Sequence, residues 1–200
     1  MVMTKDDLYF YGMGNLYDAY RIFGAHLIKD NKGIVLGTRF TVYAPHAKEV
    51  NVLGEFNNYQ AWVHNLSKVD DSGIWSLFVD AAKQWQKYKY QIKTFDGREL
   101  YKSDPYAFYS SERPETMSKI YDIDGYVWND KKYMKNRHKE ASYNNQMSVY
   151  ELHLGTWMTK PNGDFHAYNE MVELLIPYLQ ENGFTHVEFM PIVEHPLDQS

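Results

Sequence analysis

The hydrophobic positions of this chain follow one rule before residue 149 and another rule after it. Up to that point, short runs with alternating apolar side chains are separated by turn residues, as in an antiparallel β-sandwich. The stretch from Val149 to Leu154 also alternates with period 2, which predicts a strand, and Gly155 ends it. A loop, a helical pattern and a second strand follow, which is the start of a βαβ unit. The pattern therefore predicts two domains of different class.

Five strand-like runs form the predicted sandwich, which we expect to be all-β and immunoglobulin-like. They are Arg39 to Ala44, Glu49 to Leu53, Ile74 to Asp80, Tyr88 to Phe95 and Thr116 to Tyr121. The fourth run alternates most clearly, and its aromatic face predicts core. The opposite face, which is predicted to meet solvent, consists of Lys87, Lys89, Gln91 and Lys93. Asp96 and Gly97 then predict a two-residue type I′ hairpin, in which both positions need positive φ.

Two further segments flank the sandwich. Asn15 to Gly24 predicts a short helix, because Asn15 can cap it and Gly24 fits its end. Between Asn129 and Asn145 the apolar periodicity fades and basic residues gather, which favours a solvated linker over a polyanion site. The expected domains are a helical lead-in at 1–30, the sandwich at 31–128, a linker at 129–146 and a second domain at 147–200.

The second half carries the period of a helix and then that of a strand. One face of the helix, which Gly183 can end, consists of Val172, Leu175 and Leu179. Pro177 is expected to kink or split this helix. Thr185 to Met190 predicts a strand parallel to the one at 149–154. An α/β barrel takes about 250 residues, so this half holds at most the first βαβ portion of an incomplete (β/α)8 barrel.

Composition narrows the choice of partners. Lys and Arg total 21 against 26 Asp and Glu, a formal net charge of -5, so no global field attracts nucleic acid or an anionic membrane. The 18 Tyr, 10 Phe and 5 Trp offer flat faces of the kind that bind sugar rings, although an aromatic-rich β-core is the simpler explanation. Without cysteine, neither a disulfide nor a thiolate zinc site is possible. The first residues lack the pattern of a secretory signal, and no stretch approaches the roughly 18 apolar residues of a membrane span, which predicts a cytoplasmic protein.

Specific motifs in both halves carry a family resemblance. VYELHLGTW and GFTHVEFMPIVEHPLDQS are similar, respectively, to the first barrel strand and to the second strand with its following loop in the 1,4-α-glucan (glycogen) branching enzymes of the α-amylase superfamily. Upstream, the segments that resemble the family-48 carbohydrate-binding module preceding the barrel are GTRFTVYAPHAKEVNVLGEFNNY, GIWSLFV, YKYQI and DPYAF. The resemblance runs from about Phe23 to Ser200.

The resemblance implies an enzyme that cuts an α-1,4 linkage through a covalent glycosyl-enzyme intermediate and transfers the chain to a 6-hydroxyl. This is retaining chemistry on two carboxylates. The motifs that carry these carboxylates in the family do not occur in this sequence, so no catalytic residue is assigned and the chain alone is expected to be inactive. Glu151 and Glu188 are expected to be structural, in a polar layer of the barrel. His153 and His186 lack the spacing of a metal pair, so no metal site and no cofactor are predicted.

Three residues are candidates for glucan binding by the module. In glycogen-binding members of the module family, an FNNW-type turn supplies an aromatic platform and a strand lysine supplies a donor. Here Tyr59 stands in place of the tryptophan, Lys89 has the strand position, and Trp62 could compensate if the turn folds it outward. The second tryptophan of those members is missing, since no aromatic follows the next hairpin until Tyr101. A module that packs only as a scaffold is therefore the alternative.

Beyond the second predicted strand, Glu194, His195 and Asp198 lie where βα loops build active-site walls. By resemblance this loop helps to shape a glucan groove; alternatively, Pro191 and Pro196 simply stiffen it. The expected partner is an α-glucan polysaccharide such as glycogen or an amylose-like chain. Two other functions stay open: a stand-alone α-glucan-binding module, and the N-terminal part of a debranching or isoamylase-type hydrolase.

Overall fold

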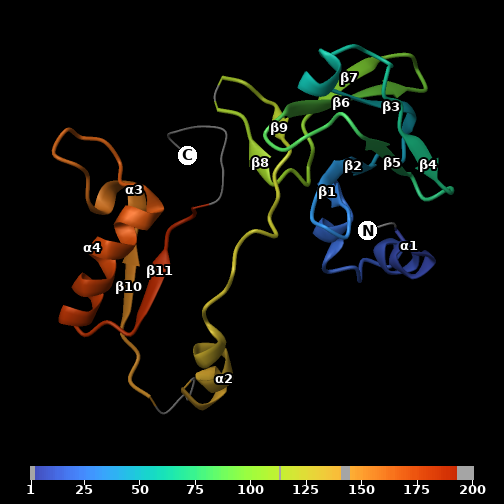
Figure 1. Ribbon diagram of the computed structural model, residues 1–200. Coiled ribbons are helices and arrows are strands. Elements are labelled where there is room, and N and C mark those ends of the chain that lie inside the picture. The colour runs from blue at the N-terminus through green and yellow to red at the C-terminus, as the bar shows by residue number, and fades with distance from the viewer. Residues whose placement is uncertain (1–2, 113, 141–144, 193–200) are drawn as a thin grey trace. The chain divides into compact units, whose positions relative to one another are not determined.

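The computed structural model describes residues 3–112, 114–140 and 145–192. The chain forms two compact units, Met1–Val127 and Trp128–Ser200 (Figure 1). The first unit is built mainly of strands, and the second contains helices and a pair of strands.

Two antiparallel sheets make up the first unit (Figure 1). One has the strand order β1-β2-β5-β4, with bounds β1 Gly24–Lys29, β2 Val35–Tyr43, β4 Ser67–Val69 and β5 Ile74–Val79. The other has the order β3-β6-β9-β8, with β7 also paired to β6. Its bounds are β3 Ala47–Gly54, β6 Lys87–Thr94, β7 Glu99–Lys102, β8 Tyr109–Ser110 and β9 Ser118–Lys119. Each of the five predicted runs contains a strand, so the predicted antiparallel β-fold of this half is confirmed.

The core of the first unit gathers the inward side chains of both sheets. Strand alternation turns Phe40 of β2 and Val50 and Val52 of β3 inward, where all three are buried in one apolar cluster. Trp75 of β5 belongs to the same cluster, and its indole N–H donates to the carbonyl of Ala44 at 3.0 Å. Trp75 is therefore a core residue, as the alternation of its strand predicts.

The outer face of β6 differs from its prediction at Gln91. This residue is 1% exposed, although alternation places it among the lysines of the predicted solvent face. Asn51, also buried, donates from Nδ2 to Gln91 Oε1 at 3.3 Å. The Nε2 group of Gln91 donates to Glu99 at 3.0 Å and to the Tyr101 hydroxyl at 3.1 Å. The buried amide is tolerated because it is hydrogen-bonded, which the pattern of polar residues does not reveal.

The hairpin between β6 and β7 lies where it was predicted but has a different turn. The Thr94 N–H donates to the Arg98 carbonyl at 3.0 Å, which leaves three residues, 95–97, in the loop. Gly97 has φ 87°, whereas Asp96 is not among the described non-glycine residues with positive φ. Three-residue loops of this kind place only their last residue in the left-handed region. The predicted two-residue type I′ turn is therefore wrong.

The N-terminal helix lies earlier in the chain than predicted. The chain before β1 contains helix α1, Lys5–Gly12, and a short 3-10 turn, η1, Ala19–Arg21. Thr4 caps α1, because its Oγ1 accepts from the Asp7 N–H at 3.2 Å while Asp7 Oδ2 accepts from the Thr4 N–H at 2.8 Å. Gly24, which the prediction places at the end of a helix, begins β1. The predicted helix at 15–24 is therefore wrong.

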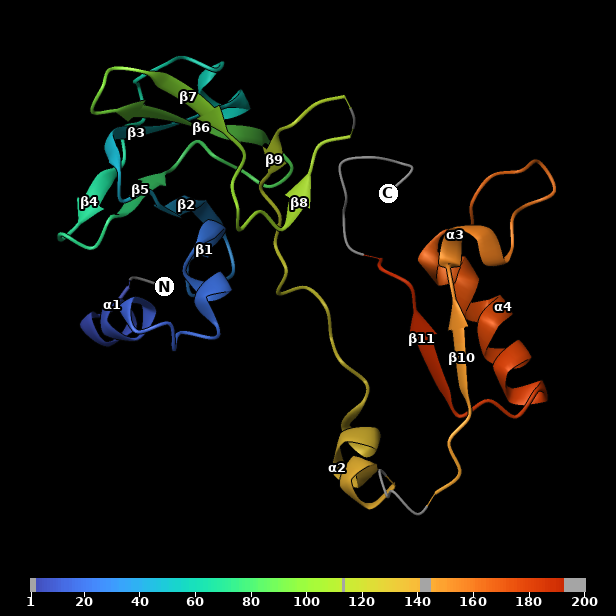
Figure 2. The ribbon, with the colours of Figure 1, turned by 180° about the vertical axis from the view of Figure 1, so that it is seen from behind.

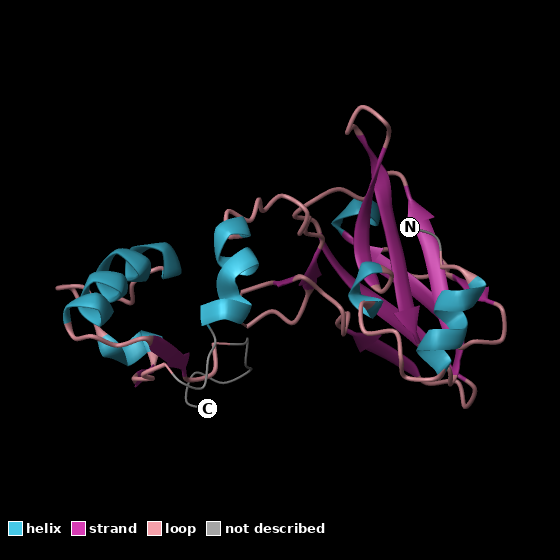
Figure 3. Ribbon diagram, turned by 90° about the horizontal axis from the view of Figure 1, so that it is seen from below, coloured by secondary structure: helices cyan, strands magenta, loops and turns pink. Residues whose placement is uncertain are grey.

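Helix α1 packs on the outer side of the first sheet (Figure 3). Leu8 and Tyr11 contact a small apolar cluster that includes Phe23 and Ile74. Ile74 and Trp75 are successive residues of β5, so they face opposite sides of the sheet. Since Trp75 faces the core, the α1 cluster covers the other side.

The second unit contains a parallel pair of strands with a helix between them in the sequence. Its described elements are α2 Lys131–Glu140, β10 Val149–Leu152, α3 Leu154–Trp157, α4 Tyr168–Glu181 and β11 His186–Phe189. β10 and β11 pair in parallel, with Val149 opposite His186. Helix α4 lies beside this pair in both Figure 1 and Figure 2. Tyr150 of β10 contacts Tyr178 of α4, with ring centroids 5.4 Å apart.

Details of the second unit differ from the sequence pattern. Strand β10 ends at Leu152 rather than at Leu154, because Leu154–Trp157 forms one helical turn. Helix α4 continues through Pro177 and is not split. The expected linker contains helix α2, whose residues are mainly long polar side chains with good helix propensity and no apolar stripe. None of the described helices is long and apolar enough to cross a membrane.

Candidate functional site

The turn after β3 builds the candidate site, and Asn57 lies at its centre. Asn57 is buried; its Oδ1 accepts from the Gly54 N–H at 2.9 Å, and its Nδ2 donates to the Val52 carbonyl at 3.2 Å. Phe56 packs against the core cluster. The first asparagine of this turn is therefore a structural residue that closes the turn and so positions Tyr59.

Tyr59 lines a depression of about 400 Å³ in the surface of the first unit. Its N–H donates to the Gly54 carbonyl at 2.9 Å. Asn58 and Tyr59 have φ values of 51° and 57°, a left-handed conformation that asparagine tolerates but that is unfavourable for tyrosine. Tyr59 is 43% exposed. The strained turn thus presents an aromatic side chain to solvent.

Lys89 of β6 lines the same depression. The other lining residues are Lys87, Pro114, Glu115, Thr116 and Met117. The Nζ group of Lys89 donates to Thr116 Oγ1 at 2.7 Å, which fixes the direction of the lysine. The fold therefore brings together two of the three residues proposed from the sequence, Tyr59 and Lys89.

An ion pair that the sequence analysis missed lies beside them. Lys87 Nζ is 2.6 Å from Glu115 Oε2. The hydrogen bond between them lowers the pKa of Glu115 and raises the pKa of Lys87, so both are charged at neutral pH. Partial burial raises the pKa of Tyr59, which keeps its hydroxyl protonated and able to donate. The alternation of β6 already places Lys87 on the face of Lys89, but no pattern points to Glu115.

Trp62 lies outside the depression that Tyr59 and Lys89 line. It has φ 59°, and the Nζ group of Lys93 is 5.8 Å from the centroid of its ring. A cation at this distance is attracted by the ring face. Lys93 and Lys89 share one face of β6, so Trp62 lies farther along the same side of the sheet rather than beside Tyr59.

The depression combines a ring face with groups that exchange hydrogen bonds with hydroxyls. The ammonium groups of Lys87 and Lys89 donate, the Glu115 carboxylate accepts, and the Thr116 hydroxyl does both. Within the described residues, no group of three or more His, Cys, Asp or Glu could hold a metal ion. The chemistry of the depression fits a neutral ligand with many hydroxyls and a flat face, as a sugar ring has.

In the second unit, the parallel register brings two carboxylates side by side. Glu151 of β10 is paired with Glu188 of β11, and both are exposed. His186 lies at the start of β11, whereas His153 follows the end of β10. In a parallel pair these positions are at opposite ends, so the two histidines do not form a ligand pair.

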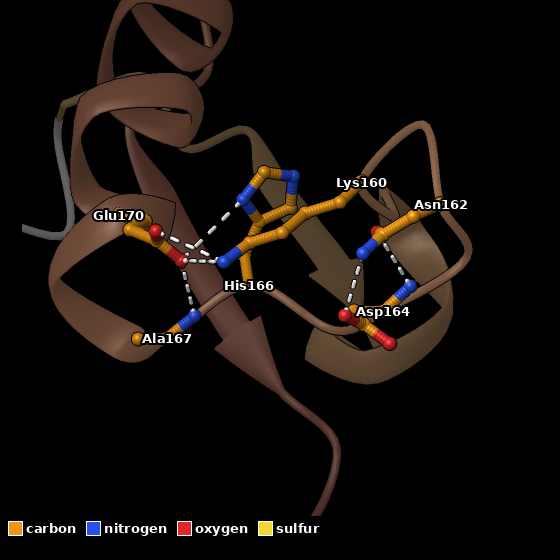
Figure 4. Close-up of polar contacts among 6 residues, drawn as sticks. All are labelled: Lys160, Asn162, Asp164, His166, Ala167 and Glu170. Carbon is orange, nitrogen blue, oxygen red and sulfur yellow. Dashed lines mark hydrogen bonds and ion pairs between the residues drawn. The ribbon is translucent and has the colours of Figure 1, made fainter.

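A polar network holds the loop between β10 and α4 (Figure 4). Glu170 accepts from the Ala167 N–H at 2.7 Å and from Lys160 Nζ at 3.0 Å. The hydrogen bond from Lys160 lowers the pKa of Glu170. Asn162 Nδ2 donates to Asp164 Oδ2 at 2.7 Å within the loop. This loop follows the carboxyl end of β10, the end at which α/β proteins carry their sites. Glu194, His195 and Asp198, the candidates in the loop after β11, lie outside the described residues.

Comparison with known sequences identifies relatives for nearly the whole chain. Residues 22–107 match the family model of carbohydrate-binding module 48 (isoamylase N-terminal domain). The chain is 48% identical over 197 residues to the 1,4-alpha-glucan branching enzyme GlgB of Geobacillus stearothermophilus, a match that covers 98% of this chain and 30% of that enzyme. The corresponding enzyme of Bacillus mycoides (strain KBAB4) is 48% identical over 184 residues, covering 92% of this chain and 28% of that enzyme. The chain thus spans about 30% of the length of these curated relatives.

Solved structures share the fold. The ligand-free structure of PulA from Klebsiella pneumoniae has a TM-score of 0.62 at 22% identity, covering 96% of this chain and 19% of that chain. The catalytic module of the glycogen-degrading pneumococcal virulence factor SpuA has a TM-score of 0.60 at 19% identity, covering 86% of this chain and 27% of that chain. From these findings together, residues 22–107 match carbohydrate-binding module 48, and nearly the whole chain is similar to a part of the 1,4-α-glucan branching enzymes.

Proposed function

We propose that this chain is the N-terminal part of a 1,4-α-glucan branching enzyme and that its first unit binds α-glucan. The observation that carries the proposal is the depression shared by Tyr59 and Lys89, which lies within the segment that matches carbohydrate-binding module 48. An α-glucan is a neutral polymer of sugar rings, so a ring face flanked by donors and acceptors suits it. The formal net charge of -5 also fits a neutral partner better than a polyanion.

The residues of the depression have separate roles in this proposal. Tyr59 stacks on a pyranose ring, because one end of its side chain is apolar and the other end carries a hydroxyl. Lys89 donates to a sugar hydroxyl from the position that Thr116 fixes. Trp62 makes a further contact along the same side of the sheet. By the family resemblance, Glu194, His195 and Asp198 line the glucan groove of the complete enzyme.

We also propose that the first unit is an immunoglobulin-like module and that β10, α4 and β11 are the first βαβ portion of a (β/α)8 barrel, with residues 129–146 as the linker. The parallel pairing of β10 and β11 and the helix between them support the second part. In such an enzyme, an α-1,4-glucan chain is transferred to a 6-hydroxyl by two carboxylates. No residue of this chain is assigned to that chemistry, and its own part is to hold the glucan.

The proposal is tested by exchanging this chain for the matching part of the Geobacillus stearothermophilus enzyme. The chimera is incubated with amylose, and branching is followed as loss of the iodine complex and as new α-1,6 linkages in the proton NMR spectrum. We expect the chimera to branch amylose, whereas the enzyme with the matching part deleted does not. A chimera that folds, by circular dichroism and size-exclusion chromatography, but forms no α-1,6 linkage would contradict the proposal.

A further inference from the structure

A second group of aromatic side chains lies at the surface near the start of β6. The ring centroid of Trp85 is 5.3 Å from that of Tyr109 and 5.1 Å from that of Tyr121, and the two tyrosine rings are 5.5 Å apart. Trp85 is 53% exposed and Tyr109 is 44% exposed, so these two rings lie at the surface, whereas Tyr121 is half-buried beside them. We call these three residues the Trp85 cluster.

The backbone holds Trp85 in a strained conformation. Its φ is 74°, in the left-handed region that bulky side chains rarely adopt, and its N–H is fixed by donation to the Ile120 carbonyl at 2.7 Å. Three of the five described non-glycine residues with positive φ are aromatic, namely Tyr59, Trp62 and Trp85. Strain of this kind is typical of functional sites. The Trp85 cluster thus shares a backbone feature with the Tyr59 turn.

The Trp85 cluster lies on the same face of the sheet as the Tyr59 depression. Lys87 of β6 is opposite Lys119 of β9, and Lys119 is opposite Tyr109 of β8. Directly opposed residues point to the same face, so these three side chains form a row across three strands. The row spans two inter-strand spacings, about 10 Å. Its first member, Lys87, lines the depression, and Lys119 Nζ is 5.3 Å from the centroid of the Tyr109 ring.

We propose that the Trp85 cluster is a second α-glucan contact that extends the Tyr59 depression, so that the first unit binds long glucan chains more tightly than short ones. This inference rests on the proposed function. One chain stacks on Tyr59, crosses the row of lysines, which donate to its hydroxyls, and stacks again on Tyr109 and Trp85. A protein partner is the other possible occupant of exposed rings. The centre of a protein interface is depleted of charge, however, and here Lys87, Glu115 and Lys119 lie between the two aromatic groups.

The test compares oligosaccharides of different length on the 200-residue chain by isothermal titration calorimetry. Tyr109→Ala is expected to weaken binding of maltoheptaose about tenfold, the loss of one ring contact of roughly 1.4 kcal/mol, and to leave maltotriose within about twofold. Tyr59→Ala is expected to weaken the binding of both maltoheptaose and maltotriose. Tyr109→Phe keeps the ring and is the matched control, with affinities within about twofold of the wild type.

A second variant separates lost contact from lost folding. Trp85→Gly removes the ring and relieves the positive φ, so it is expected to keep or raise the melting temperature and to show the same length-selective loss. If Tyr109→Ala and Trp85→Gly bind maltoheptaose like the wild type while Tyr59→Ala does not, the extension is wrong and the proposed function stands. If the wild-type chain binds neither oligosaccharide, both the proposed glucan binding by the first unit and its extension to the Trp85 cluster are wrong.

Discussion

At the scale of single residues, the carboxylate of Asp104 organises a buried polar group in the first unit. The hydroxyls of Tyr88 and Tyr90 donate to its Oδ2 at 2.7 Å and 3.1 Å, and the Tyr106 N–H donates to its Oδ1 at 2.8 Å. Asp104 and both tyrosines are buried. Because a buried carboxylate is costly unless it is hydrogen-bonded, these bonds fix the chain after β7 against the inner face of β6.

Tyr88→Phe is expected to lower the free energy of unfolding by about 1.5–3 kcal/mol, because it removes a hydrogen bond to a buried charge. The measurement is urea denaturation followed by circular dichroism. Tyr9→Phe, at an exposed position of α1, is the control and should change stability by less than about 0.5 kcal/mol. If Tyr88→Phe also changed the free energy of unfolding by less than about 0.5 kcal/mol, the hydrogen bond from Tyr88 to Asp104 would not contribute to stability.

The stability of the first unit should depend on pH through Asp104. Burial raises the pKa of Asp104, although the hydrogen bonds from Tyr88 and Tyr90 oppose the shift. The folded state therefore binds the proton more tightly than the unfolded chain, in which the pKa of an aspartate is about 3.9. The stabilisation that Asp104 provides is therefore greatest below the pKa of the unfolded chain, and it is lost as the pH rises through the higher pKa of the folded state. The quantity to measure is the difference in unfolding free energy between the wild type and Asp104→Asn. This difference should fall as the pH rises from about 3, and an increase with pH would show that the pKa of Asp104 is lowered on folding rather than raised.

At the scale of elements, alternation predicts β2, β3, β5, β6 and β9 but not β1 or the short strands β4, β7 and β8, and it does not predict helices α1 and α2 or the turn after β6. Helix α1 has no buried residue, and its one local signal is the capping pair Thr4 and Asp7. Helix α2 has no apolar stripe. The turn at 95–97 is set by the pairing of Thr94 with Arg98, which short-range propensity does not specify. These elements depend on hydrogen bonds and register rather than on hydrophobic period.

The sequence likewise predicts some residues of the candidate site and not others. Tyr59 and Lys89 could be named in advance because a family motif and strand alternation mark them. Glu115 could not, since it lies in a segment without hydrophobic period and reaches Lys87 only through the fold. Asparagine is common in turns of every kind, so the sequence does not single out Asn57. Its hydrogen bonds to Gly54, Val52 and His64 are seen only in the folded structure.

Gly54→Ala is expected to disrupt the Tyr59 turn. A Cβ at this position would lie 2.4 Å from the Lys87 carbonyl oxygen and 2.7 Å from Cε1 of Phe56, so the turn would have to move away from β6. We expect a loss of about 1–3 kcal/mol in thermal or urea unfolding, as for other overpacked sites. Gly12→Ala, where a Cβ would meet nothing within 4 Å, is the matched control and should not destabilise the chain. Equal stability of the two variants would show that the turn is not tightly packed.

In the second unit, Glu170→Ala is expected to loosen the loop before α4. The substitution removes the acceptor of both the Ala167 N–H and Lys160 Nζ, so the Ala167 amide should exchange with solvent deuterium faster. Hydrogen exchange read by NMR measures this directly. Glu173→Ala, on an exposed position of the same helix, is the control and should leave that amide unchanged. Unchanged exchange in Glu170→Ala would mean that the loop is held by other contacts.

At the scale of the whole molecule, the chain combines a β-unit that carries the candidate sugar site with a unit that contains a parallel strand pair. The first unit contains the segment that matches carbohydrate-binding module 48, and 98% of the chain is similar to a branching enzyme. The chain spans 30% of that enzyme, so the transfer reaction belongs to the proposed complete protein. Glucan binding is the part of the proposal that this chain can show alone.

That binding is tested most directly by electrophoresis of the purified chain in native gels with and without glycogen. We expect glycogen to retard the wild-type chain and Tyr59→Ala to lose most of this retardation. Tyr17→Ala, which removes another exposed tyrosine of the same unit, should be retarded like the wild type. Equal mobility of the wild type with and without glycogen, or undiminished retardation of Tyr59→Ala, would contradict a glucan site at Tyr59.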